Sequence, residues 1–302
     1  MVYTEIARNK RKTALFITSF LSIIIGLGYV FSLYTEEPVV LPIVVIFAVL
    51  MSLFSYFYSD KVALGISKAH EIKRSDDEEL YRTVENLSIG AGLPTPKIYL
   101  INDTALNAFA TGRDPVHASV AITSGLRSQL TKQELEGVMA HELSHIGNYD
   151  IRLSTIVVVL VGIIALISDW MLRITFYGGR KKSNNNSNGN GIILLVALAL
   201  AILSPIIASL IQLAISRKRE YLADASGALL TRYPQGLISA LEKIAQDHEP
   251  LEVANKATAH LYFANPLNEH EKKKDGVGRF ARLFQTHPPI NDRINKLKNM
   301  SF

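Results

Sequence analysis

Residues 131–150 of this 302-residue chain read TKQELEGVMAHELSHIGNYD, and this stretch predicts the helix around which the fold is organised. Thr131 and Glu134 have the spacing of a capping box, in which each side chain satisfies a backbone amide at the start of a helix. Apolar residues then recur at helical spacing. Because His141 and His145 lie one helical turn apart, both imidazoles can reach one metal ion.

The segment His141-Glu142-Leu143-Ser144-His145 is an HExxH arrangement. Zinc in such a site takes three protein ligands and one water, whose pKa falls to about 7. Glu142 can then take the proton of this water and deliver it to a leaving amine. The chain has no cysteine, so the ligands must be histidines and carboxylates.

The alternative is that these are two surface histidines on an amphipathic helix. Four His-Glu pairs occur in the chain, and the pair at His141 alone has another histidine four residues later. A candidate third ligand is Glu220, in the segment SRKREYLAD at residues 216–224. Asp224 follows Glu220 by four residues, so on a helix it would face the same way and could orient a ligand imidazole. A solvated charged helix face is the other interpretation of this segment.

Four apolar stretches suggest membrane helices, and 48% of all residues are hydrophobic. They span residues 13–34, 38–58, 153–172 and 191–215. The last two could instead be buried core helices, since they are less purely apolar. The basic N-terminus predicts a cytoplasmic start, although the basic loop between the last two stretches conflicts with the positive-inside rule.

These stretches divide the chain into four predicted parts. Residues 1–58 form an N-terminal membrane anchor, and residues 59–150 form the first part of a catalytic domain. Residues 151–215 form a membrane hairpin, and residues 216–302 complete the catalytic domain. An even number of membrane passes would return the last part to the side of the second. We therefore expect the Glu220 segment to lie beside the His141 helix.

Soluble structure is predicted mainly between residues 75 and 123. Ser75 and Glu78 have capping-box spacing and predict the start of a helix. Extended segments are predicted at residues 97–101, 106–111 and 118–123, which would form a small sheet. The net charge of +5 is spread over many loops without an aromatic-interleaved basic stripe, so nucleic acid is not an expected partner.

On these residues the sequence resembles the HtpX family of membrane-bound zinc proteases, relatives of the CAAX prenyl proteases. The matching motifs follow one another along most of the chain: the basic start with two early apolar spans, Asn107-Ala108-Phe109-Ala110, the His141 motif extended through Asn148 and Asp150, two central apolar segments, Arg219 to Asp224, Phe263-Ala264-Asn265-Pro266, and His287-Pro288-Pro289 with Arg293. The resemblance implies that Glu220 is the third ligand, that the catalytic domain faces the cytoplasm, and that the protein takes part in quality control of membrane proteins.

The resemblance also suggests residues that contact the substrate. The segment containing Asn107, Ala108 and Phe109 would form a sheet edge along the cleft, which can bind an extended peptide through its backbone. An ordinary interior strand is the alternative. His287 and Arg293 are candidate donors to the oxyanion of the transition state. Alternatively, His287 caps the last helix and Arg293 pairs with an acidic surface residue.

The sequence therefore predicts an α+β fold: a mainly helical, zincin-like metalloprotease domain with a small sheet and about four transmembrane helices. We expect the protein to bind one Zn²⁺ per chain. With it the enzyme would hydrolyse misfolded or damaged membrane proteins and other unfolded polypeptides at the cytoplasmic membrane. A CAAX-type prenyl protease is a rival with more spans. A transporter or scaffold is a second rival, disfavoured because Asp169 is nearly the only charge within the four stretches.

Overall fold

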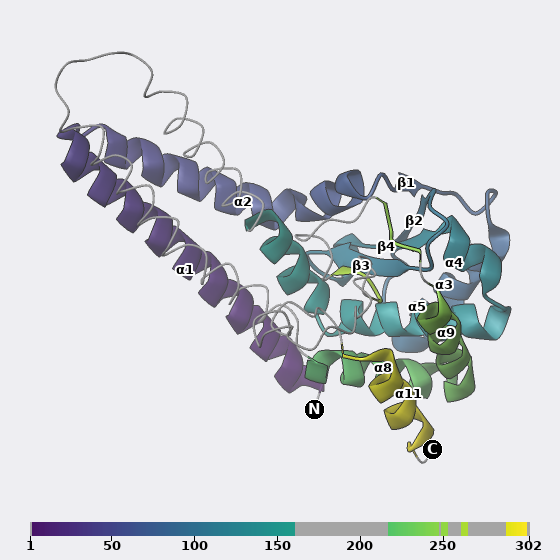
Figure 1. Ribbon diagram of the computed structural model, residues 1–302. Helices are drawn as coiled ribbons and strands as arrows, with labels where there is room; N and C mark the ends of the chain where they lie inside the picture. The colour runs from purple at the N-terminus through teal and green to yellow at the C-terminus, as the bar shows by residue number, and fades with distance from the viewer. Residues whose placement is uncertain (1, 161–216, 248, 253–260, 265–287, 301–302) are drawn as a thin grey trace, which may run out of the picture.

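The computed structural model describes residues 2–160, 217–247, 249–252, 261–264 and 288–300 (Figure 1). Its first two elements are long helices, α1 (Val2–Thr35) and α2 (Val40–Ile66), which form a hairpin that projects from the rest of the molecule. Within them, Ile6–Tyr29 and Val40–Ile66 are long and apolar enough to cross a membrane. Large apolar side chains such as Leu50 and Leu53 are exposed, as expected of helices that face lipid.

The second helix is longer than the apolar stretch 38–58 predicts, because its last turns belong to the folded domain. Ala63 and Leu64 are buried there and pack with Ile101 of the sheet. The third predicted stretch, 153–172, is described only as far as residue 160, and residues 150–160 are helical. The fourth, 191–215, lies outside the described residues. The described residues thus contain two candidate spans, and the predicted total of about four stays a prediction.

A four-stranded sheet with the order β1-β2-β4-β3 supports the site. Strands β2 (Lys97–Ile101) and β4 (Ala118–Thr123) are parallel neighbours and have the predicted bounds. Strand β3 (Ala108–Gly112) is antiparallel to β4 at one edge and begins two residues later than predicted. The short strand β1 (His70–Glu71) was not predicted, because two residues carry no periodic pattern and become a strand only by pairing with β2.

The first helix of the domain, α3 (Glu78–Ala91), does not start with the capping box predicted at Ser75 and Glu78. Its cap is Asp77, whose carboxylate accepts a hydrogen bond of 3.0 Å from the backbone N–H of Leu80. The helix ends at Gly92, whose φ of 67° lies in the left-handed region that glycine adopts without strain.

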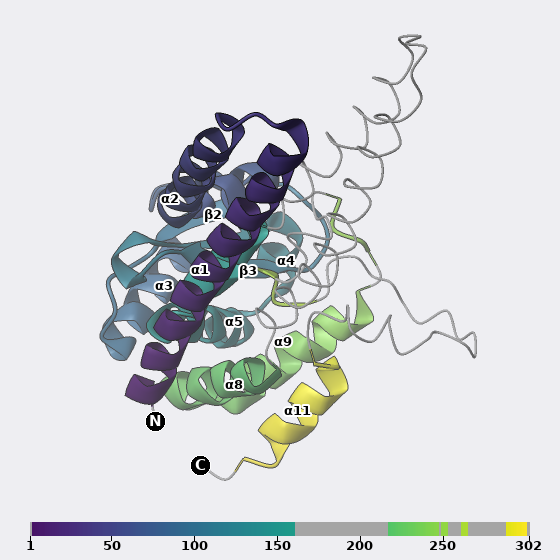
Figure 2. The ribbon, with the colours of Figure 1, turned by 90° about the vertical axis from the view of Figure 1, so that its left-hand side faces the viewer.

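Helix α5 (Lys132–Gly147) lies at the centre of the domain. It packs against α3, β3 and two later helices, α8 (Arg217–Thr231) and α9 (Pro234–Gln246). Short elements complete the described fold: η1 (Pro115–His117), α4 (Ser124–Gln129) and α11 (Ile290–Lys298). Figure 2 shows α8 beside α5, with α9 and α11 adjoining it. The Glu220 segment therefore lies directly against the His141 helix, as the even number of membrane passes predicts.

Candidate metal centre

Two features of helix α5 hold the HExxH segment in place: the hydrogen bond at its start and its buried apolar face. The backbone N–H of Thr131 donates to Oε2 of Glu134 at 2.7 Å, which is one half of the predicted capping box. Leu135, Val138 and Met139 are buried in the main core and fix the rotation of the helix. The two histidines lie one helical turn apart on the same helix, and His141 is itself buried.

Glycine allows α8 to approach α5 closely. A Cβ atom at Gly227 would lie 3.0 Å from the backbone nitrogen of His141, tighter than an ordinary contact. No side chain separates the two helices at Gly227. The carboxylates of Asp224 and Glu220, which lie one and two turns earlier on α8, therefore come close to the imidazoles. Oε2 of Glu220 lies 3.9 Å from Nε2 of His141, and Oε1 lies 3.7 Å from Nε2 of His145.

The three predicted ligands fit one metal ion. Donor atoms of His141, His145 and Glu220 all lie within 4.8 Å of one another, and the two Nε2 atoms are 3.1 Å apart. Tetrahedral zinc with bonds of about 2.0–2.1 Å places its donors roughly 3.3 Å apart. The observed separations lie on both sides of this value.

The remaining ring nitrogens determine which way the histidines point. Nδ1 of His141 lies 2.9 Å from Oδ1 of Asp224, and Nδ1 of His145 lies 3.0 Å from Oδ2 of Asp150. A carboxylate only accepts hydrogen bonds, so each Nδ1 carries a proton and each Nε2 presents a lone pair. Two lone pairs facing each other at 3.1 Å repel unless a positive charge lies between them. The arrangement therefore fits a cation.

Charges around the site favour such a cation. Burial lowers the pKa of His141 to about 4, against the opposing effect of Asp224. Burial also disfavours the charged form of His145, but the hydrogen bond with Asp150 and the charge of Glu220 outweigh it and raise the pKa of His145 to about 9. One imidazole, that of His145, therefore favours a bound proton between the two rings. A metal dication bound there would replace this proton.

Glu142 is buried beside these donors, with 2% of its surface exposed. Burial raises its pKa to about 7; His145 lowers the pKa, while Glu220 adds to the rise. The backbone of Ala110 in β3 hydrogen-bonds with it. A carboxyl group that exchanges its proton near neutral pH suits a residue that must accept a proton and then release it.

Behind His141, a buried ion pair holds Asp224. Nε and Nη2 of Arg293 donate to the Asp224 carboxylate at 2.9 and 2.7 Å, and Nη1 donates to the carbonyl oxygen of Phe263 at 2.9 Å. Burial alone would raise the pKa of Asp224, but the Arg293 cation and the hydrogen bond with His141 lower it to about 2. These contacts place Arg293 against Asp224 and do not test its predicted role as an oxyanion donor.

His287, the other predicted donor, lies outside the described residues. The predicted substrate segment, in contrast, is fully described. The side chain of Asn107 donates to the carbonyl oxygen of Ala264, and Phe109 is buried against Tyr262. Both side chains are therefore structural, and any contact with substrate would come from the backbone of this strand.

The backbone of β3 alternates between its partner strand and the open edge of the sheet. Asn107 bonds with Thr123 of β4, so Ala108 and Ala110 direct their backbone groups outward. The outward carbonyl of Ala108 accepts a hydrogen bond from Phe263. Ala110 lies next along the edge, beside Glu142.

Asp150 and Asn9 are site residues to which sequence reasoning gave no role. Asp150 belongs to the extended His141 motif, and its spacing of five residues from His145 is the signal that could have indicated its role. Asn9 carries no local signal, because a single asparagine in a basic N-terminal segment is unremarkable. Its Nδ2 donates to Oδ1 of Asp150 at 2.7 Å across 141 residues of sequence.

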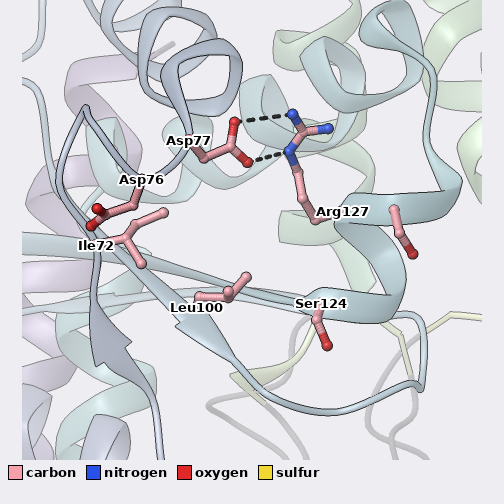
Figure 3. Close-up of a pocket in the computed structure, with 7 residues that line it drawn as sticks. Ile72, Asp76, Asp77, Leu100, Ser124 and Arg127 are labelled. Atoms are coloured by element: carbon pink, nitrogen blue, oxygen red, sulfur yellow. Dashed lines mark hydrogen bonds and ion pairs between the residues drawn. The ribbon is translucent and has the colours of Figure 1, made fainter.

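A separate cavity of about 260 Å³ contains none of these donors (Figure 3). It is lined by residues around β1, β2 and α4, and its cation, Arg127, is bound by both oxygens of Asp77. The cavity is therefore a feature of the α3 cap and is distinct from the metal centre.

An HExxH helix that faces a carboxylate on a second helix has the donor set of a metallopeptidase, and the glutamate of its motif, Glu142, is buried beside the donors. Comparison with known proteins agrees, since the model of peptidase family M48 matches residues 74–301. The chain belongs to this family. Its resemblance to the HtpX family is confirmed by curated relatives described as protease HtpX homologues.

One such relative, from Tropheryma whipplei (strain Twist), is 45% identical over 300 residues, which cover 99% of each chain. Another, from Lactobacillus helveticus (strain DPC 4571), is 44% identical over 310 residues, covering 99% of this chain and 100% of the relative. Among solved structures, S. mikatae Ste24p matches with a TM-score of 0.49 and 19% identity, covering 97% of this chain and 66% of that one. Family membership and two long apolar helices make the protein a membrane metalloprotease.

Proposed function

We propose that this protein is a zinc endopeptidase that binds one Zn²⁺ through His141, His145 and Glu220. The observation that carries the proposal is the pair of imidazole Nε2 atoms that face each other at 3.1 Å, with the Glu220 carboxylate beside them. Bound zinc would supply Lewis acidity, which lowers the pKa of a ligand water to about 7.

Glu142 supplies the proton transfer. Its carboxylate accepts a proton from the attacking water and returns it to the amine of the leaving peptide. Its burial supports this role, because a pKa of about 7 lets the same group accept and release a proton near neutral pH. Asp224 and Asp150 keep the two imidazoles oriented through their Nδ1 atoms.

The outward edge of β3 is the proposed substrate-binding strand. The backbone carbonyl of Ala110 can accept a hydrogen bond from an extended peptide, which gives binding with little dependence on side chains. Asn107, Ala108 and Phe109 support this edge: the first two bond with residues 263–264, and the third packs in the core. The oxyanion role predicted for His287 and Arg293 stays a prediction, and the contacts of Arg293 support a positioning role instead.

We further propose a multi-pass arrangement with the active site in the cytoplasm. Residues 1–58 would anchor the chain, residues 59–150 and 216–302 would form the catalytic domain, and residues 151–215 would form a second membrane hairpin. The metal centre lies close to the start of α1, because Asn9 contacts Asp150. A site at the membrane surface is placed to act on misfolded membrane proteins and on unfolded polypeptides.

A CAAX-type prenyl protease is a less favoured alternative, since the curated relatives are described as HtpX homologues. A transporter or scaffold is disfavoured by the family match. Cleavage of a prenylated peptide in preference to an unfolded protein would support the first alternative.

The test uses the full-length protein purified in detergent, with metal analysis and digestion of unfolded casein measured together. We expect one zinc per chain, loss of digestion after chelation, and recovery on adding zinc. Glu142→Gln should keep zinc and lose digestion, because the amide has nearly the same shape but cannot accept a proton. Glu136→Gln, on the same helix, is the matched control and should stay active. Digestion by Glu142→Gln at the wild-type rate would contradict the mechanism.

A further inference from the structure

A polar side chain of the first membrane helix is buried against the metal centre. Asn9 of α1 is 1% exposed, and its Nδ2 donates both to the backbone carbonyl of Asn148 at 2.9 Å and to Oδ1 of Asp150 at 2.7 Å. Both acceptors, the carbonyl of Asn148 and the carboxylate of Asp150, lie in one turn of the chain about 140 residues after Asn9. Burial of an amide NH₂ group is costly unless such bonds compensate it, so these contacts specify how α1 is placed.

Asp150 has two oxygens with different partners. Oδ2 lies 3.0 Å from Nδ1 of His145, and Oδ1 accepts the hydrogen bond from Asn9. Arg219, one residue before Glu220, places its Nη1 3.5 Å from the same Oδ1. The carboxylate thus connects α1, the HExxH helix and the start of α8.

The turn that carries Asp150 needs support from outside itself. Tyr149 has a φ of 60°, a left-handed conformation that residues other than glycine rarely adopt. Lys10, the neighbour of Asn9 on α1, places its Nζ 4.6 Å from the centre of the Tyr149 ring. Two consecutive residues of α1 therefore contact the turn that sets the direction of the Asp150 carboxylate.

We propose that Asn9 is a positioning residue of the metal centre: the first membrane helix holds Asp150, and through it fixes the imidazole of His145. The inference rests on the proposed metal ligands and extends them to a residue within a candidate membrane span. Displacement of α1 would then loosen a metal ligand without any change in the ligands themselves. Retention of the metal would then depend on the correct packing of α1 against the catalytic domain.

A residue that merely docks α1 would behave differently. Its loss would lower the stability of the protein to the same extent whether Asp150 is present or not. A positioning residue acts through Asp150, so its effect on the metal should disappear once the carboxylate is removed. The two roles are therefore separated by a double-mutant cycle read at the metal.

The experiment loads full-length protein in detergent with zinc and follows transfer of the metal to a chromogenic chelator. Asn9→Leu keeps the approximate size of the side chain and removes both donors. Ser55→Ala is the matched control: Ser55 is a buried polar residue of α2 whose Oγ donates to the carbonyl oxygen of Ile156, beyond the Asp150 turn. The visible spectrum of the Co²⁺-loaded protein reports the coordination geometry of each variant.

Outer partners of metal ligands typically contribute about 10 to 100-fold to affinity, so we expect a loss of this size for Asp150→Ala. For Asn9→Leu, one bond further out, we expect zinc transfer about 3 to 10-fold faster than wild type and a shifted Co²⁺ spectrum. Ser55→Ala should match wild type. In the Asp150→Ala background, Asn9→Leu should add less than about twofold.

Wild-type transfer rates in Asn9→Leu would overturn the inference, as would an equal effect with and without Asp150. Should Asn9→Leu fail to fold, Asn9→Gln, which moves the amide by one methylene, is measured in the same way, and an unchanged rate again overturns it. Wild-type protein that binds no zinc would instead overturn the proposed function, and with it this inference. The two failures are thus distinguishable.

Discussion

The guanidinium of Arg293 and the carboxylate of Asp224 form a buried bidentate ion pair, with nitrogen–oxygen distances of 2.9 and 2.7 Å. The pair joins α11 to α8 across 69 residues of sequence. Oδ1 of Asp224 also lies 2.9 Å from Nδ1 of His141, so this carboxylate connects α11 to a proposed metal ligand. Arg293 is completely shielded from solvent.

We expect Arg293→Ala to destabilise the protein by about 3–5 kcal/mol, because it leaves the Asp224 carboxylate buried without its cation. The double variant with Asp224→Asn should recover part of this loss, since no charge is then left unpaired. Denaturant unfolding of the metal-free proteins measures both. A variant with normal stability and zinc content but turnover lower by about 100-fold would instead support the oxyanion role.

The same pair makes stability depend on pH in an acidic window. The folded protein lowers the pKa of Asp224 from 3.8 to about 2. Because the carboxylate is the stabilised form, its contribution is fully present above about pH 4 and is lost as the pH falls through 2. That contribution is on the order of 2 kcal/mol. Unfolding of metal-free wild type and Asp224→Asn, compared between pH 5 and 2, should show a smaller slope in the variant; parallel curves would contradict the prediction.

Removal of Glu220 should empty the site of metal. We expect Glu220→Ala to lose zinc during dialysis, because two imidazoles alone leave half of a tetrahedral coordination shell to solvent. Asp224→Ala should only weaken binding, by about 10 to 100-fold, since it removes the orientation of His141 and no donor. Metal analysis after dialysis against graded chelator separates the two. Equal zinc content in Glu220→Ala and wild type would exclude Glu220 as a ligand.

The proposed orientation can be tested with single cysteines, because the chain has none of its own. Val116→Cys and Leu229→Cys lie on the catalytic domain, where the native side chains are 73% and 63% exposed. Glu36→Cys lies in the turn between α1 and α2. A membrane-impermeant thiol reagent should label the last position in intact cells and the first two only after lysis. The reverse pattern would place the active site outside.

Local patterns accounted for the elements whose stabilising groups are near in sequence. The start of α5 follows from Thr131 and Glu134, which satisfy each other three residues apart. The start of α3 cannot be predicted from neighbouring residues in the same way. Ser75 and Asp77 are both suitable N-cap residues, and a contact with a distant residue favours Asp77. Arg127 of α4 holds both oxygens of Asp77 at 2.6 and 3.0 Å, and this contact depends on how the helices pack.

The sequence by itself determined the one-turn spacing of His141 and His145, with Glu142 between them, because helical geometry requires only neighbouring residues to bring these groups to one side. It also indicated Glu220 and Asp224 as a pair on one helix face. Tertiary structure alone decided that Asp224 belongs to His141, Asp150 to His145, and Asn9 to Asp150. These partners are separated by 5 to 141 residues, and their distances depend on the close approach at Gly227, the left-handed turn at Tyr149 and the seating of α1.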